Sequence, residues 1–147
     1  MFVRFLIVSF LFVIVGCSES DSSKTASLVQ PRVEVKIYGE GGDNPKVKLP
    51  LLTWPSFKEQ NISLSKQNWN QGASKALFCV VEENDGTPIE IGAKIKFIEN
   101  SVCNHTYFRP SEGIPQKREL GLVKIKIVET GQEVWTWSSA VENISSR

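Results

Sequence analysis

The sequence has 147 residues, of which 41% are hydrophobic, and it carries 17 basic and 16 acidic side chains. Residues 1–16 form a separate apolar block, so the remainder has room for one domain with a formal charge close to zero. Nucleic-acid binding driven by positive charge is therefore not expected. A single histidine, His105, and three aspartates leave little material for metal sites or acid–base catalysis.

The first residues of the chain have the pattern of a secretory signal. Arg4 precedes a run from Phe5 to Val15 that is apolar apart from one serine. A transmembrane helix needs roughly 20 apolar residues, and this run is too short and ends in a polar stretch. We therefore expect residues 1–16 to be a signal peptide that is removed.

The end of the apolar run, Ile14-Val15-Gly16-Cys17, resembles the lipobox of bacterial lipoproteins. The resemblance implies that the Cys17 thiol carries a diacylglyceryl group and that the peptide is cut just before this residue. Each buried methylene of an acyl chain contributes about 0.8 kcal/mol, so two or three chains anchor a protein permanently. Ser18, where an aspartate tends to retain lipoproteins in the inner membrane, implies the periplasmic face of the outer membrane.

An ordinary secretory signal, in which Cys17 is incidental, is the alternative. The sequons that begin at Asn61, Asn104 and Asn143 would then be glycan acceptors. The cysteine count favours the lipid, because three cysteines in an oxidising compartment leave one unpaired thiol.

A small, polar segment without hydrophobic periodicity follows the lipobox, from Ser18 to about Gln30. Such a composition is typical of a flexible linker. We therefore expect residues 17–31 to be the lipidated cysteine and a tether, and residues 32–147 to be a single β-rich domain.

From residue 32 onward, apolar and polar residues alternate, as in half-buried strands. The alternation predicts strands at 33–37, 89–97 and 123–127, and weaker patterns occur at 47–52, 62–65, 102–109 and 133–138. The segment 76–81 is apolar on both faces, which predicts a central strand buried between layers. The best candidate for a helix is 56–61, or a turn near 69–75, and either would be short.

Several short strands separated by Gly, Pro and Asn turns predict an all-β fold, a small antiparallel β-sandwich, with a small β-barrel as the alternative. Within this fold the segment ALFCVVEENDGTPIEIGAKIKF, residues 76–97, resembles the strand–turn–strand opening of bacterial immunoglobulin-like and carboxypeptidase-regulatory-like modules. The resemblance lies in Asp85-Gly86, Pro88 and Gly92-Ala93. It implies an immunoglobulin-like sandwich and carries over no catalytic residues.

The other two cysteines, Cys79 and Cys103, lie in predicted strands of an exported domain. Because the compartment favours oxidation, we expect them to form a disulfide. A reactive thiol would need an exposed, electropositive setting, which the neighbours Phe78 and Val80 do not suggest.

The sequence contains no recognisable catalytic or cofactor motif. No Gly-x-Ser-x-Gly pattern is present for a nucleophilic serine, and Gly39-Glu40-Gly41-Gly42 lacks the lysine of a phosphate-binding loop. One imidazole and two oxidised sulfurs are too few ligands for zinc, so no metal is expected and His105 is expected at the surface or a strand edge. Glutamates are numerous, so paired carboxylates for glycoside cleavage stay an open alternative.

The tryptophans are the first candidate binding residues. Trp135 and Trp137 are two positions apart in a predicted strand, so they share one face. This face is either part of the core, which we favour, or an exposed platform for a glycan or a protein. Trp54 and Trp69 have loop-like surroundings, where such aromatic anchors also occur.

A second candidate is the segment 109–119, which is rich in proline and glycine. The basic residues Arg109, Lys117 and Arg118 gather around it. Its length makes it the expected recognition loop.

Together these features predict a lipid-anchored lipoprotein of the cell envelope that acts as a non-enzymatic protein-interaction module. Secretion or envelope assembly components and immunity or exclusion factors are of this kind. The alternative is a protein that binds or hydrolyses cell-wall glycan. The expected partners are the membrane, through the anchor, and an envelope protein, with a glycan as the alternative and no nucleic acid or cofactor.

Overall fold

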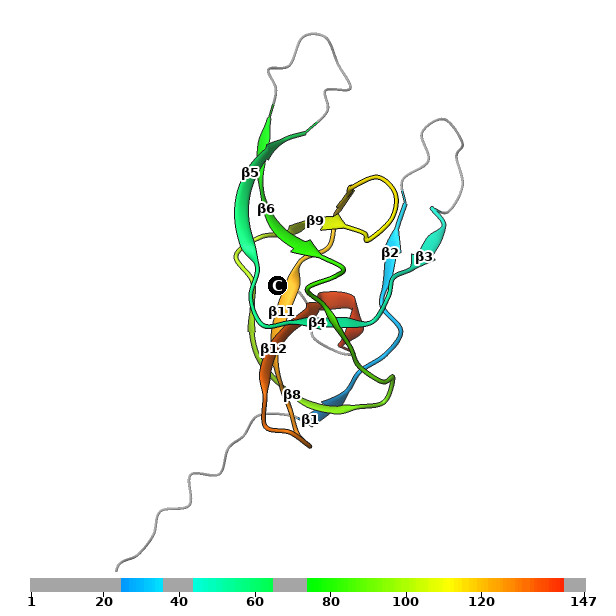
Figure 1. Cartoon of the computed structure of the whole chain (residues 1–147), viewed down its shortest axis with the longest axis vertical. Helices are drawn as coiled ribbons and strands as arrows, with labels where there is room; N and C mark the ends of the chain where they lie inside the picture. Colours follow the sequence, from blue (N-terminus) through cyan, green and yellow to red (C-terminus); the bar gives the residue numbers. More distant parts are fainter. Residues whose placement is uncertain (1–24, 36–43, 65–73, 142–147) are drawn as a thin grey trace, which may run out of the picture.

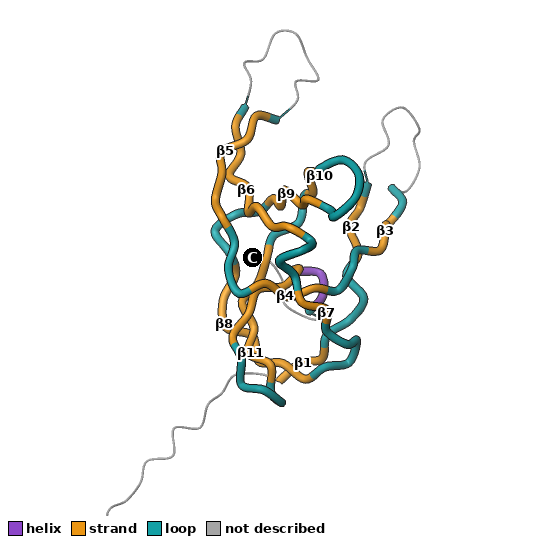
Figure 2. Tube along the Cα trace, viewed as in Figure 1, coloured by secondary structure: helices purple, strands orange, loops and turns teal. Residues whose placement is uncertain are grey.

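The computed structural model describes residues 25–35, 44–64 and 74–141. These residues form an all-β fold, as the sequence predicted, and contain one short 3₁₀ turn (Figure 2). The strands in chain order are β1 (Thr25–Ser27), β2 (Arg32–Glu34), β3 (Lys46–Lys48), β4 (Leu52–Trp54), β5 (Lys58–Ser63), β6 (Lys75–Glu82), β7 (Thr87–Pro88), β8 (Lys94–Asn100), β9 (His105–Arg109), β10 (Gln116–Arg118), β11 (Leu122–Ile127) and β12 (Glu133–Trp137), and the 3₁₀ turn is η1 (Ser138–Ala140). Within the described ranges, no helix is long and apolar enough to cross a membrane.

Two main sheets build the domain. A six-stranded sheet has the order β1-β8-β11-β12-β4-β7, a four-stranded sheet has the order β10-β9-β6-β5, and β2 and β3 form a separate pair. The β5–β6 and β2–β3 hairpins project at one end of the molecule, and β1 and β8 lie at the other (Figure 1). Both main sheets are open in the described part of the chain, which favours a sandwich over a closed barrel.

One strand pair departs from the fully antiparallel arrangement that we expected. Strands β6 and β9 run parallel, with Cys79 opposite Thr106. Between them the chain crosses to the six-stranded sheet, forms β7 and β8 there, and returns in the original direction. Parallel neighbours require such a crossover, whereas antiparallel neighbours can be joined by a tight turn.

Aromatic side chains from both sheets meet in the core. Trp54 and Trp137 of the six-stranded sheet pack edge-on with ring centroids 5.1 Å apart, and Trp137 lies 5.5 Å from Phe108 of the four-stranded sheet. The two buried indole N–H groups donate to backbone oxygens: that of Trp54 to Glu82 O and that of Trp137 to Pro50 O, each at 2.8 Å. Both rings are therefore buried without an unsatisfied donor.

The predicted disulfide joins Cys79 of β6 to Cys103, which precedes β9, with 5.7 Å between the Cα atoms. Because β6 and β9 are neighbours, the bond closes a loop within one sheet and does not cross between the two layers. Gly121 packs against this loop, and a Cβ there would lie only 2.8 Å from Cys103 O. Only glycine fits this position without displacing the backbone.

The folded part of the chain begins earlier than the sequence indicated. Strand β1 pairs with β8, Thr25 opposite Lys96, and the next residue after β1, Leu28, is buried and bridges to Val141. The expected tether of residues 17–31 is therefore wrong from Thr25 onward. Its small polar residues carry no hydrophobic period, and the pairing that orders them depends on a strand distant in sequence.

The expected helix at 56–61 is also wrong, because strand β5 covers Lys58–Ser63 and pairs with β6 along its whole length. This segment has no apolar stripe that a helix could bury, whereas β6 offers a ladder of backbone hydrogen bonds. The turn expected at 69–75 lies mostly outside the described residues.

The expected strand at 89–97 begins only at Lys94. Residues 89–93 form a turn in which the Ala93 N–H donates to Glu90 O at 3.2 Å and Gly92 has a φ of 89°. Glycine tolerates this left-handed conformation, so its position ends the alternation. The expected strand at 47–52 is likewise divided, into β3 and β4, because Pro50 has no N–H to donate.

Candidate functional site

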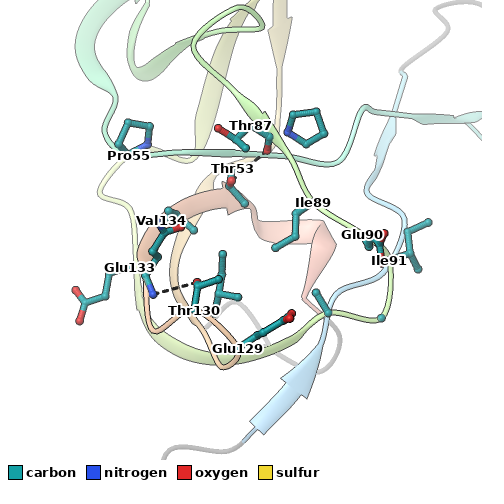
Figure 3. A pocket seen from close by; sticks show the side chains of 15 residues that line it. Thr53, Pro55, Thr87, Ile89, Glu90, Ile91, Glu129, Thr130, Glu133 and Val134 are labelled. Atoms are coloured by element: carbon teal, nitrogen blue, oxygen red, sulfur yellow. Dashed lines mark hydrogen bonds between the residues drawn. The ribbon is translucent and has the colours of Figure 1, made fainter.

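The six-stranded sheet curls so that its two outer strands approach each other. On one side the Ile89 N–H donates to Leu51 O at 3.3 Å, next to β4 and β7, and on the other the Gly92 N–H donates to Leu28 O at 2.7 Å, next to β1. The turn of residues 89–93 therefore spans the gap between the two ends of the sheet. Figure 3 shows β4, β12, β8 and this turn surrounding an opening.

The curled sheet holds a pocket of about 790 Å³. This volume is within the range of small-ligand pockets. The aliphatic part of the lining includes Ile89, Ala93, Ile127 and Val134, and the remainder includes threonines, a glutamine and glutamates. These aliphatic residues come from the turn, from β11 and from β12, so the pocket could not be predicted from any single segment of the sequence.

Strand alternation explains why the pocket and the aromatic core share the same strands. In β12, Val134 lines the pocket, whereas Trp137 points to the other face and packs in the core. In β4, Thr53 lines the pocket and the adjacent Trp54 is in the core. Successive side chains of a strand point to opposite faces, so one sheet presents an aromatic face and an aliphatic face.

Two threonine hydroxyls at or next to the wall of the pocket already have hydrogen-bond partners. Thr53 Oγ1 donates to Thr87 O at 3.1 Å, and the neighbouring buried Thr136 Oγ1 donates to Leu52 O at 2.8 Å. An apolar group that enters the pocket therefore leaves these hydroxyls satisfied. The part of the pocket lined by Thr53 is therefore suited to contact with an apolar group.

The charged residues that line the pocket are all acidic: Glu90, Glu129 and Glu133. Glu133 points away from the opening in Figure 3, and its Oε2 lies 3.0 Å from Lys124 Nζ. Glu90 and Glu129 lie at the mouth. They come from different turns, β7–β8 and β11–β12, so only the curled sheet brings them to the same opening.

An exposed aliphatic side chain accompanies these acids. Ile91, in the turn that spans the two ends of the sheet, lines the pocket and is 60% exposed. Its apolar surface is therefore available for contact with another molecule.

The structure places the predicted tryptophans mostly inside. Trp137 is 0% and Trp54 is 1% exposed, so the core alternative holds for Trp137 and the expectation of an exposed anchor is wrong for Trp54. Trp135 is half-buried and packs edge-on against Phe57 at 4.8 Å. Trp69, like Cys17, lies outside the described residues.

The three basic residues of segment 109–119 do not converge on one site. Arg109 Nη1 lies 2.9 Å from Glu82 Oε1, and Lys117 Nζ donates to Ser63 O at 2.8 Å. Arg118 donates to Gln116 Oε1, and burial lowers the pKa of its guanidinium. Lys117 and Arg118 are adjacent in β10, so their side chains leave opposite faces of the sheet.

The segment itself forms the compact β9–β10 hairpin. Ser111 ties the turn to the β6–β7 connection, because its N–H and its hydroxyl both donate to Glu83 Oε2, at 2.8 and 3.0 Å. Gly113 supplies the left-handed conformation, with a φ of 98°. Ile114 is 82% exposed at the turn. The hairpin therefore offers one prominent apolar side chain and no basic cluster.

His105 is half-buried at the start of β9, with its ring centroid 5.1 Å from that of Phe78. In the part of the chain that the structure describes, no group of three or more His, Cys, Asp or Glu side chains is arranged to hold a metal ion.

Comparison with known proteins gives no match to a family model, to a curated protein or to a solved structure. The pocket and its mouth are the candidate functional site. The alternation of β11 and β12 in the sequence could have indicated their apolar residues, but not that the sheet curls around them.

Proposed function

We propose that the protein is a lipoprotein anchored at the periplasmic face of the outer membrane, and that its β domain binds an envelope protein without catalysing a reaction. The lipobox at residues 14–17 supports the anchor. The observation that carries the binding function is the open pocket, which is lined by Ile89, Ile127 and Val134 and by the exposed Ile91.

A protein partner is favoured over a cell-wall glycan by where the aromatic side chains lie. A glycan would need a flat, exposed aromatic platform such as the one considered for Trp135 and Trp137, but Trp137 is buried and Trp135 is half-buried. The isoleucine, valine and proline side chains that line the pocket suit aliphatic side chains better than hydroxyl-rich sugars.

We also propose that the domain is an immunoglobulin-like variant. Two packed sheets with a tryptophan core support this type. The parallel β6–β9 pair and a disulfide within one sheet are the features that would make it a variant.

The anchor is tested with Cys17→Ser. We expect the wild-type protein to incorporate a palmitate analogue and the variant to incorporate none, because the thiol is the site of attachment. Ser18→Asp is the matched variant for location: it should keep the label and shift the protein to the inner-membrane fraction. A wild-type protein without label would contradict the anchor.

The binding surface is tested with a photo-crosslinking residue placed at Ile91 or, as the control, at Ile114 of the β9–β10 hairpin. In living cells we expect Ile91 to give a protein adduct of defined mass and Ile114 to give none. The adduct should disappear when Ala93→Leu fills the pocket. An adduct from Ile114 alone would move the binding surface to the hairpin, and a glycan adduct would support the alternative function.

A further inference from the structure

We propose that the pocket recognises an apolar side chain of the partner protein together with a neighbouring lysine or arginine. This inference rests on the proposed function and names the chemistry of the partner. The apolar group would enter between Ile127 and Val134, and the cation would meet Glu90 and Glu129 at the mouth.

The apolar half of the recognition follows from the wall of the pocket. Ile89, Ile127 and Val134 present methyl groups from three different segments. The buried wall hydroxyl of Thr53 already donates to Thr87 O. A side chain such as leucine or isoleucine would thus gain contact with aliphatic groups and break no hydrogen bond of the wall.

The cationic half follows from the charges at the mouth. Lysine and arginine are absent from the described residues that line the pocket, and the acid Glu133 is paired with Lys124. This leaves Glu90 and Glu129 on two separate turns around the same opening (Figure 3). Two carboxylates at one mouth attract a cation and repel an anionic partner, which gives selectivity.

The exposure of Ile91 favours a protein segment over a small molecule. Ile91 lines the pocket and is 60% exposed, so a small ligand inside the pocket would leave much of this side chain in water. A protein surface would cover it, as the buried core of a protein interface does. The adjacent edge strand β7 (Thr87–Pro88) is exposed and short, so it leaves room for the partner to approach.

Two matched peptides test the inference on the full lipoprotein in phosphatidylcholine nanodiscs. Each peptide is acetylated and amidated and holds one leucine, flanked in one by two lysines on each side and in the other by two glutamates. We expect only the lysine peptide to shift the methyl NMR signals of Ile89 and Ile127. Nanodiscs without protein control for binding to lipid.

The charges are tested by Glu90→Gln combined with Glu129→Gln, which keeps the shape of both side chains. We expect this double variant to bind the lysine peptide with about three- to tenfold lower affinity than the wild type. Added salt should lower the affinity of the wild-type protein. Glu112→Gln, in the β9–β10 turn, makes the same type of change away from the pocket and should leave the affinity unchanged.

Three results would overturn the inference: equal or tighter binding of the glutamate peptide, an absence of shifts at Ile89 and Ile127, or hexylammonium binding as tightly as the lysine peptide. The last result would assign the pocket to a small cation. If the peptides fail while the Ile91 adduct persists, the proposed function stands and only the chemistry of the partner is wrong. If both fail, the proposed function falls as well.

Discussion

The two faces of the six-stranded sheet differ in what covers them. On one face Trp54 and Trp137 pack against Phe108 of the other sheet, and their indole N–H groups are bonded to backbone oxygens. On the other face Thr53 and Val134, from the same two strands, line an open pocket. The first face is closed by a second sheet, and the second is closed only by the curl of its own sheet.

Because of this difference, residues that are adjacent in a strand contribute either to stability or to the pocket. Large aromatic rings between two sheets bury much apolar area and stabilise the fold. Small aliphatic and threonine side chains on the curled face leave space that another molecule can fill. Substitutions on the first face should therefore change stability, and substitutions on the second should change binding.

The largest effect is expected for Trp137→Ala on the closed face. The change removes a fully buried ring, leaves a cavity beside Trp54 and Phe108, and deprives Pro50 O of its donor. We expect a loss of about 3–5 kcal/mol in the free energy of unfolding, measured by chemical denaturation. A variant as stable as the wild type would mean that this face is not the core.

The disulfide should have the next largest effect. Replacing both Cys79 and Cys103 by serine opens a loop with a sequence separation of 24. The entropy of the unfolded loop then rises, and we expect a loss of roughly 3 kcal/mol. Mass analysis of the native protein, isolated from cells without reductant, should find no alkylatable thiol at either position. Two reactive thiols would contradict the pairing.

Trp135→Ala should cost less than Trp137→Ala, although both side chains leave the same face of β12. Trp135 is only half-buried, and its principal aromatic contact is Phe57. We expect a loss of about 1–2 kcal/mol, since less area is buried and the cavity stays open to water. Thermal unfolding of the two variants, measured side by side, tests this ranking. If Trp135→Ala lost more stability than Trp137→Ala, the burial of the two side chains would not explain their contributions.

The smallest effect on stability is expected for Ala93→Leu, in the turn that lines the pocket. Ala93 packs against the core but also borders the pocket, so the added atoms can extend into open space, and the free energy of unfolding should change by less than about 0.5 kcal/mol. The affinity for the lysine peptide should fall at least about tenfold, because the space for its leucine is filled. Unchanged affinity by calorimetry would place binding elsewhere.

The sequence by itself determined the all-β class and much of the strand pattern. Alternation is a local property, so it predicted strands where β6, β9, β11 and β12 lie. It also showed that Trp135 and Trp137 share a face. The pairing of Cys79 with Cys103 followed from the number of cysteines and the expected oxidising compartment.

Only the tertiary structure decided which faces are covered and which segments meet. Trp54 looked loop-like because prolines lie close to it, yet pairing of β4 with β12 places it in the core. Thr25–Ser27 looked like a tether until it paired with β8. Glu90 and Glu129, from two different turns, line the same pocket because the sheet curls. Local patterns determine which side chains share a face, whereas burial and curvature depend on strand pairs far apart in the chain.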